Sequence, residues 1–347
     1  MNIISSTSRK RETYSIQIES SLLWESALGI AAITNKQLID TLDKAANDWV
    51  QLRESLTSNL VEELSYVEEN NTWKALLQVL HYRKSESIEE FCLYIDQLAE
   101  EELKYICLPF TGNENQRDRE EASKGSSDAV ERLKKETREN PFFPAYIEFI
   151  SVVEISLFKN HIKNVMKSWF LEVIRKDESQ LTRYLQRDAQ MKEQLLEKIQ
   201  PEQLVEMVTG GRSYLPEPSI KTVLLIPQFI YRPWTIEADI EGTKVFYYPI
   251  SNESISPKDP FTPNQFLVLK YKALGDEARL KMIKLLYQKE MTLQELTDRL
   301  QLGKSTVHHH LKMLKAAKLV FSVGGTYSLN KTSLTLIENE LEQFLHA

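Results

Sequence analysis

The chain of 347 residues is poor in the residues that build disulfide frameworks and glycine-rich loops. It has two cysteines, Cys92 and Cys107, and ten glycines. Two cysteines outside a CxxC pair cannot staple a small secreted fold, and we interpret them as thiols of the core. No run of 18 apolar residues occurs, so we expect no membrane span. Residues 1–12 are charged without an apolar stretch behind them, which does not match a secretory signal, and we expect a cytoplasmic location.

The sequence also lacks the short motifs of the common enzyme classes. It contains no nucleophile elbow, no HExxH, no Walker loop and no dinucleotide fingerprint. Acidic pairs such as Glu89 and Glu90 lie in amphipathic stretches, where a solvated helix face explains them. We therefore predict a protein that is not an enzyme and that uses no cofactor.

The segment 292–329 contains the signals of a helix-turn-helix followed by a hairpin. Thr292 and Glu295 have the spacing of a capping box at the start of a first helix. Gly303 is expected to supply the unusual backbone of the turn, and Ser305 to cap a second helix. Two glycines between alternating runs then predict a primed hairpin turn. Helix, turn, helix and hairpin together describe a winged helix-turn-helix.

The second helix has one apolar and one polar face. Val307, Leu311 and Leu314 recur at helical spacing and are predicted to be buried. Short polar side chains and imidazoles on the other face suit the base edges and phosphates of a major groove. His310 lies nearer the apolar stripe and is predicted to be packed, whereas Ala316 is predicted to point away from it. The predicted DNA-binding residues are Lys304, Ser305, Thr306, His308, His309, Lys312 and Lys315.

Charge is distributed unevenly along the chain. The net charge is −7, but residues 265–347 hold 12 Lys+Arg against 8 Asp+Glu, which leaves −11 on the rest. No Asp or Glu occurs between Asp298 and Glu338, a stretch that contains five lysines. A stretch of one sign favours contact with phosphates. An acidic body beside it limits non-specific binding to nucleic acid.

A set of residues before, within and after the helix-turn-helix matches the pattern of one protein family. The matching residues are Lys272–Asp276, Arg279, Leu280, Ile283, Leu285, Leu286, Ser305–Val307, His309–Leu311, Leu314 and Lys318–Val320. With this set, the segment 265–347, about 83 of the 347 residues, resembles the ArsR family of winged-helix transcription factors. The resemblance implies binding of double-stranded DNA. It also implies a homodimer formed by the helices on either side of the motif, here 265–274 and 334–345.

The resemblance raises metal sensing, but the ligands that it implies are absent from the sequence. Metal sensors of the family often use a Cys pair in the first helix of the motif, or His and acidic ligands in the last helix. Here the first helix offers Gln294, Glu295 and Thr297, and the last offers His346 alone. The three histidines at 308–310 are separated by ~100° steps around a helix, so they cannot converge on one ion. We predict DNA contact and packing for them, and no metal.

The chain before the winged helix reads mainly as helix. Residues 22–208 have helical patterns, interrupted at 111–128 by a polar stretch that is predicted to be a long surface loop. The segments 13–18, 221–231 and 244–250 have strand patterns. The predicted fold is mostly α, with a helical sensor domain that contains a small β element near 221–250 (1–250), a proline-rich linker (251–264) and a winged helix-turn-helix domain (265–347).

Aromatic residues gather in and between the last two strand candidates, and two interpretations of them remain open. They either pack a small sheet on helices, or form one wall of a pocket for a small organic effector. Glu25 lies within an apolar run and must face solvent or be paired, because burying a lone carboxylate is costly. The candidate effector-binding residues are Trp24, Glu25, Tyr231, Arg232, Trp234 and Tyr248.

The sequence thus predicts a sequence-specific DNA-binding transcriptional regulator, a repressor modulated by an effector in its N-terminal domain. The alternative is a protein-interaction scaffold whose winged helix docks a protein partner. Apolar residues at helical spacing near the C-terminus support a homodimer, although packing against the N-terminal domain would also cover them. These residues are Leu334, Ile337, Leu341, Phe344 and Leu345, with Phe266, Leu269 and Leu274 on a comparable face of the helix before the motif.

Overall fold

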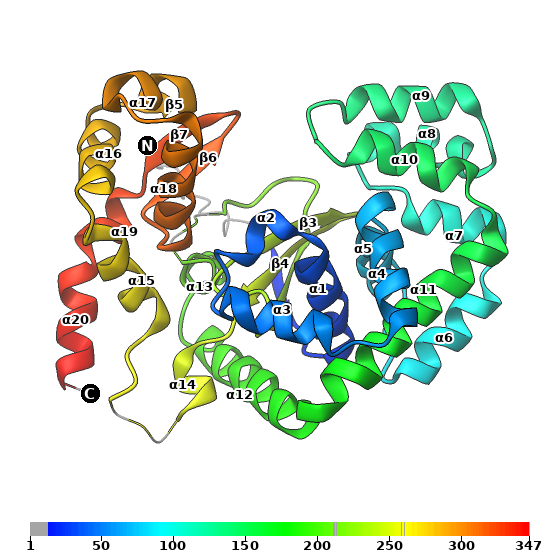
Figure 1. Ribbon diagram of the computed structural model, residues 1–347, viewed down its shortest axis with the longest axis horizontal. Helices are drawn as coiled ribbons and strands as arrows, with labels where there is room; N and C mark the ends of the chain where they lie inside the picture. Colours follow the sequence, from blue (N-terminus) through cyan, green and yellow to red (C-terminus); the bar gives the residue numbers. More distant parts are fainter. Residues whose placement is uncertain (1–12, 211, 213, 258, 260, 347) are drawn as a thin grey trace, which may run out of the picture.

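The computed structural model describes residues 13–210, 212, 214–257, 259 and 261–346. Residues 1–12, for which the sequence predicts no secretory signal, lie outside the described residues, and so does the side chain of His346. Figure 1 shows a large, mainly helical N-terminal domain around a central sheet, with a smaller C-terminal domain at its side. The fold is mostly α, as the sequence predicts.

Helix α1 (Leu22–Thr34) runs through the centre of the N-terminal domain. Its residues from Leu23 onward are all buried, as expected for a helix that is apolar all round. The Ser21 hydroxyl caps α1 by accepting a hydrogen bond from the Leu23 amide at 3.1 Å. The other helices of the domain are α2 (Lys36–Ile39), α3 (Ala46–Glu54), α4 (Ser58–Asn70), α5 (Trp73–Tyr82), α6 (Ile88–Gln97), α7 (Glu100–Cys107), α8 (Gln116–Ser123), α9 (Ser127–Glu136), α10 (Phe143–Val152), α11 (Ile155–Trp169), α12 (Glu178–Leu196) and α13 (Pro201–Val208).

The sheet of the N-terminal domain is covered on both faces. Its strands are β1 (Ser15–Ile18), β2 (Thr222–Gln228), β3 (Ile236–Ile240) and β4 (Thr243–Pro249), in the order β1-β2-β4-β3. Strand β2 is parallel to both of its neighbours. Leu224 and Ile226 pack into the core that contains α1, whereas Val223 and Leu225 pack with residues of α13. Burial on both faces explains why this segment is a nearly continuous apolar run.

The three strand patterns of the sequence correspond to β1, β2 and β4, but the sequence signal misses β3. This strand is antiparallel to β4 at the edge of the sheet. Its side chains Glu237 and Asp239 pair with Lys244 of β4, at 3.1 and 3.0 Å. Acidic residues are uncommon in strands, and the pairing that compensates for them comes from another strand.

The predicted surface loop at 111–128 is wrong, because most of this stretch forms α8 and the start of α9. Arg119 of α8 is buried, and its guanidinium donates to the Tyr105 carbonyl at 3.2 Å and to the Tyr82 hydroxyl at 3.1 Å. On the exposed side, Arg132 of α9 pairs with Asp118 at 2.7 Å. Contacts with distant residues therefore hold a helix whose own sequence is almost wholly polar.

The connection between the domains is attached to α12. It contains a short helix, α14 (Asn252–Ile255). The buried carboxylate of Asp188 accepts hydrogen bonds from the Ser251 amide at 2.9 Å and from the Ser254 hydroxyl at 2.8 Å. Arg187 donates to the Ser254 carbonyl at 2.8 Å. These bonds attach the first part of the connection to α12 of the N-terminal domain.

The C-terminal domain has its own apolar core and forms the predicted winged helix-turn-helix. Its sheet has the order β5-β7-β6, and the hairpin turn between β6 and β7 has φ of 55° at Gly324 and 80° at Gly325. Positive φ at both positions is the geometry of the predicted primed turn. The elements are α15 (Gln265–Leu274), α16 (Glu277–Gln288), β5 (Met291–Thr292), α17 (Leu293–Leu300), α18 (Lys304–Ala316), β6 (Val320–Val323), β7 (Thr326–Leu329), α19 (Lys331–Thr335) and α20 (Ile337–His346).

The structure confirms the capping box of the helix-turn-helix and corrects the turn that follows. The Thr292 amide donates to the Glu295 carboxylate at 2.7 Å, and the Glu295 amide donates to the Thr292 hydroxyl at 3.3 Å. In the turn, Gln301 adopts the left-handed backbone with φ of 55°, whereas Gly303 is extended with φ of −62°. Gly303 is also the N-cap of α18, so Ser305 lies in the first turn of this helix.

Candidate nucleic-acid interface

Helix α18 lies with one face in the core of the C-terminal domain and the other in solvent. Val307, Leu311 and Leu314 are buried against residues of α16 and α17, as predicted. The opposite face exposes five of the predicted DNA-binding residues, and Lys312 is half-buried. The five are Lys304, Ser305, Thr306, His308 and His309. Ala316 is buried and does not belong to this face, in contrast to its predicted position.

The N-terminal end of α18 is suited to a phosphate group. No side chain caps it, because the N-cap is Gly303. The first-turn amides and the positive end of the helix dipole are therefore open to an anion. Lys304 adds a charge at the same end. Burial lowers the pKa of His308, and the charges of Lys312 and Lys315 lower it further. A neutral His308 can both donate and accept hydrogen bonds at a base edge.

His310 is packed, as predicted, and belongs to a brace between three helices. Arg279 of α16 is buried, and its guanidinium donates to the Ala273 carbonyl at 2.7 Å and to the Lys272 carbonyl at 3.0 Å, at the end of α15. The same guanidinium lies 3.4 Å from the His310 ring nitrogen and 3.2 Å from the sulfur of Met313. Arg279 thus links the end of α15 to α18. This is a structural role for one of the residues that carry the family resemblance.

Lys315 faces away from the solvent-exposed surface of α18. Its ammonium donates to the Ser322 hydroxyl of β6 at 2.9 Å. Its pKa is lowered by burial and by the charge of Arg212, a residue of the N-terminal domain. The structure therefore places Lys315 between the wing and the domain junction, and six of the seven predicted residues remain together at the exposed face.

The six candidate effector-binding residues do not line one cavity. Trp24 packs against His81 and against Tyr247, with ring centroids 4.6 and 5.7 Å apart. Tyr248 belongs to the cluster on the other face of the sheet, with residues of α13. Neighbouring residues of one strand point to opposite faces, which separates Tyr248 from Trp24. Tyr231 is buried in the core around α1, and Trp234 donates from its indole nitrogen to the Thr41 hydroxyl at 2.9 Å.

Glu25 and Arg232 have structural partners. The Glu25 carboxylate is buried and accepts hydrogen bonds from the Phe229 amide at 3.0 Å and the Ile230 amide at 2.5 Å. Burial raises the pKa of Glu25 to about 7, although these amides and Arg232 act in the opposite direction. Arg232 pairs with Asp43 at 3.2 Å and donates to the Asn252 amide oxygen at 2.5 Å. It thus joins the sheet end to the interdomain connection.

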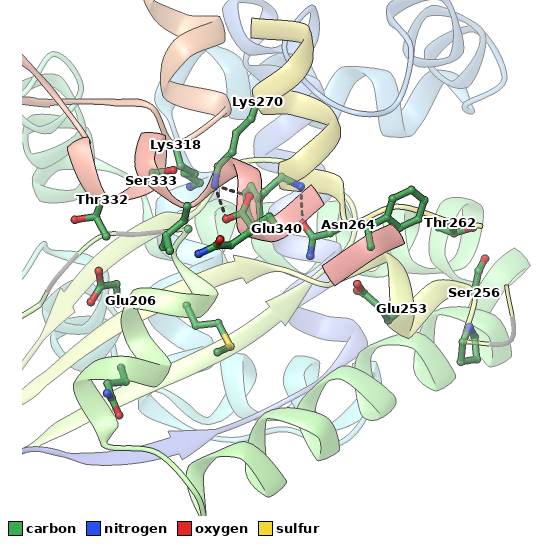
Figure 2. Close-up of a pocket in the computed structure, with 18 of the residues that line it drawn as sticks. Glu206, Glu253, Ser256, Thr262, Asn264, Lys270, Lys318, Thr332, Ser333 and Glu340 are labelled. Atoms are coloured by element: carbon green, nitrogen blue, oxygen red, sulfur yellow. Dashed lines mark hydrogen bonds and ion pairs between the residues drawn. The ribbon is translucent and has the colours of Figure 1, made fainter. Parts of the chain in front are cut away.

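A groove of about 1090 Å³ lies between the two domains, at a place that no sequence signal indicates. Figure 2 shows Lys270 and Glu340 of the C-terminal domain at one side and Glu206 of α13 across from them. Its lining comes from α13, from the interdomain connection and from three helices of the C-terminal domain. These segments are far apart in the sequence, so no local sequence pattern predicts that they meet at a groove. Of these lining residues, Lys318 alone belongs to the set that carries the family resemblance, and the structure gives it a left-handed backbone with φ of 57°.

The described residues contain neither a cluster of metal ligands nor a membrane-spanning helix. Among the His, Cys, Asp and Glu side chains described by the structure, no three converge as ligands of a metal ion. No helix in the described ranges is long and apolar enough to cross a membrane.

One comparison with known proteins gives a match. Residues 276–322 match the family model described as bacterial regulatory protein, arsR family. The match begins at Asp276, the N-cap of α16, and ends inside β6, so it spans α16, α17 and α18. No curated protein and no solved structure matches the chain significantly.

Proposed function

Starting from the finding that the C-terminal domain is an ArsR-type winged helix-turn-helix, we propose that this chain is a cytoplasmic, homodimeric repressor of transcription. In this proposal α18 enters the major groove of DNA, and a small organic effector bound by the N-terminal part changes the affinity for the operator. The wing hairpin lies beside α18 and would contact the adjacent backbone.

One observation carries the proposal. Five polar residues, from Lys304 to His309, are exposed on one face of a helix whose other face is locked into the core of the domain. A rigid helix that presents imidazoles, hydroxyls and a lysine can contact both bases and phosphates. The uncapped N-terminus of α18 adds backbone donors to the same surface.

A homodimer explains the apolar residues that the chain leaves exposed on α15 and α20, although Ile337 of the predicted stripe is buried in the core of its own domain. The C-terminal stripe is divided between α19 and α20, and α20 packs on α15. Leu345 of α20 is 67% exposed and Tyr271 of α15 is 44% exposed, and neither residue lines the groove between the domains. A second copy bound there would cover both residues and place two reading helices one turn of DNA apart, ~34 Å.

We propose sensing rather than catalysis for the N-terminal domain. Its arrangement closest to a catalytic triad is a hydrogen-bonded chain in which His161 lies between Glu63 and Thr72. The Thr72 hydroxyl lies 2.7 Å from the His161 ring, but Thr72 is 1% exposed. A hydroxyl at such a position does not reach a substrate, so the chain of bonds serves to join α4, α5 and α11.

Selection from a pool of random double-stranded DNA tests the proposed function. The full chain should enrich an inverted repeat whose half-sites are centred about 10 base pairs, or a multiple of that distance, apart. Enrichment of no common sequence over several rounds would contradict sequence-specific recognition. The variant His309→Ala, selected in parallel, should enrich a motif with relaxed preference at one position of each half-site.

A further inference from the structure

The groove between the domains has apolar walls on both sides and opens to solvent. Met207 of α13 is 51% exposed, and Leu336, between α19 and α20, is 43% exposed across from it. Phe266 and Phe344 add aromatic rings to the apolar part of the lining. Exposed apolar side chains on facing walls are what a bound apolar group covers, and the groove volume of about 1090 Å³ is enough for a drug-sized molecule.

Lys318 lies where this groove meets a second, smaller cavity of about 180 Å³, and it lines both. It directly follows α18 and the short turn behind it. Its aliphatic stem lies on Gly210 at the end of α13, and a Cβ at Gly210 would be 2.4 Å from Lys318 Cγ. Its ammonium donates to the Thr235 hydroxyl at 3.1 Å and lies 5.7 Å from the centroid of the Phe266 ring.

The charge of Lys318 lacks a counterion within the part of the chain that the structure describes. No ion pair joins its ammonium to a described carboxylate, and its bond is to the Thr235 hydroxyl. Arg212 and Lys315 are its cationic neighbours, and Arg212 is itself paired with Glu237 in the same small cavity. Burial, followed by the charges of Arg212 and Lys315, lowers the pKa of Lys318 to about 7. A half-buried ammonium without a counterion costs free energy, and a bound anion would recover part of it.

The other charged groups of the groove are paired with each other or in contact with solvent. Lys270 of α15 holds both oxygens of the Glu340 carboxylate, at 2.6 and 2.8 Å. Glu253 and Asp259 are exposed to solvent at the rim, and Glu206 is half-buried on the wall. Solvated carboxylates need no ligand, whereas the ammonium at the inner end does.

We propose that this groove is the effector site and that its ligand is an amphipathic organic acid, with an anionic group on Lys318 and an apolar body between Met207, Phe266 and Leu336. Such a ligand would touch α13 of the N-terminal domain and the residue that follows the reading helix. It would therefore select one position of α18 relative to the N-terminal domain. This consequence for DNA rests on the proposed function, whereas the binding of the ligand does not.

The binding test uses the full chain without DNA and a fluorescent amphipathic anion, 8-anilinonaphthalene-1-sulfonate. Decanoate should displace this probe at a concentration at least tenfold lower than 1-decanol or decyltrimethylammonium, each used below its micellar range. Lys318→Met should weaken decanoate binding at least tenfold. Lys284→Met, which removes an exposed lysine of α16 outside both cavities, should leave it unchanged. Displacement by decyltrimethylammonium in preference to decanoate would overturn the proposal.

The pH dependence separates a ligand contact from a purely structural role of Lys318. Above the pKa of about 7 its ammonium loses its proton, so the affinity for decanoate should decrease up to tenfold per pH unit between pH 7 and 9. Arg212 stays charged throughout this range. Lys318→Arg keeps its charge and should abolish the decrease. Equal pH profiles for the parent and Lys318→Arg would contradict the assignment.

A second variant keeps the test valid if changes at Lys318 impair folding. Met207→Trp places a larger ring in the groove from an exposed position of α13 and should abolish decanoate binding while the thermal unfolding midpoint is retained. Unchanged decanoate affinity in Met207→Trp would overturn the location of the site. DNA affinity measured with and without decanoate then tests the coupling: decanoate binding with no change in DNA affinity would contradict the regulatory role and leave DNA recognition intact.

Discussion

Lys318 and Gly210 are in contact although they come from different domains, and the contact depends on glycine. With φ of 72°, Gly210 has a backbone that other residues resist, and it leaves room for the lysine stem. This pair joins the end of α13 to the turn behind α18. A movement of α13 would therefore act on the end of α18 through the half-buried side chain of Lys318.

The exposed face of α18 predicts how its variants bind DNA. His309→Ala should weaken binding to the selected sequence by ~1–3 kcal/mol, because a lost base contact affects the specific complex. Its affinity for unrelated DNA should stay close to that of the parent. Fluorescence anisotropy with both DNAs measures the two affinities, and equal losses for both would show that His309 does not read a base.

Lys304 is predicted to act through phosphate instead. Lys304→Ala should weaken binding to all sequences to a similar extent and reduce the slope of log affinity against log salt by about 1. The matched variant Lys281→Ala removes a lysine of α16 that pairs with Glu277 at the surface, and it should leave the slope unchanged. A Lys304 variant with the parental slope would remove this residue from the interface.

Glu25 should make stability depend on pH. Its pKa is raised from 4.5 to about 7 in the folded chain, so the folded state binds a proton more tightly than the unfolded state. The contribution of the protonated Glu25 carboxyl to the free energy of unfolding is fully present below about pH 4.5. It is lost as the pH rises through about 7. The loss is on the order of 3 kcal/mol at most. Glu25→Gln should flatten this part of the profile of unfolding free energy against pH, and an unchanged profile would contradict the buried carboxyl.

Helix α8 should depend on one buried guanidinium. Arg119→Ala leaves the carbonyl of Tyr105 and the hydroxyl of Tyr82 without their donor, which costs about 1–3 kcal/mol. Amide hydrogen exchange in 113–123 should accelerate. Arg117→Ala, on the exposed side of the same helix, removes only a surface pair with Glu121 and should change exchange little. Equal effects of the two variants would mean that the packing of Arg119 does not hold α8.

The proposed dimer can be tested at Leu345. Leu345→Glu places a charge in the expected interface, where a second copy would bury it, and should convert a dimer into a monomer of 40.3 kDa. Leu93→Glu is a matched control, because Leu93 is 60% exposed on α6 of the other domain. Multi-angle light scattering distinguishes the species. A parent chain that is monomeric at micromolar concentration, with and without its DNA site, would exclude the dimer.

The winged helix could be predicted from the sequence because its signals are local. A capping box, a stripe such as Val307 and Leu311, and the pair Gly324–Gly325 each specify their own geometry within a few residues. The sequence predicts the unusual backbone of the turn at Gly303, but Gln301 takes the left-handed conformation that glycine more commonly adopts. Its conformation follows from how α17 and α18 pack together.

The interdomain groove and helix α8 could not be predicted in this way. The lining of the groove joins α13 to α15, α19 and α20, and the partners of Arg119 lie outside its own helix. The aromatic residues around β2 and β4 show the converse, because residues that are close in the sequence lie apart in the structure. Tyr247 and Tyr248 are adjacent in sequence but pack on opposite faces of the sheet, so a cluster in the sequence is not a cluster in space.

The most direct test of the central claim, that α18 reads DNA, is a titration of the full chain with its selected DNA site and with a scrambled DNA of the same length. Anisotropy at several salt concentrations gives both affinities and their salt slopes. Our account predicts that the selected site binds at least ~10³-fold more tightly than the scrambled one, and that the affinity for both decreases with salt. Equal affinity for the two DNAs at every salt concentration would contradict it.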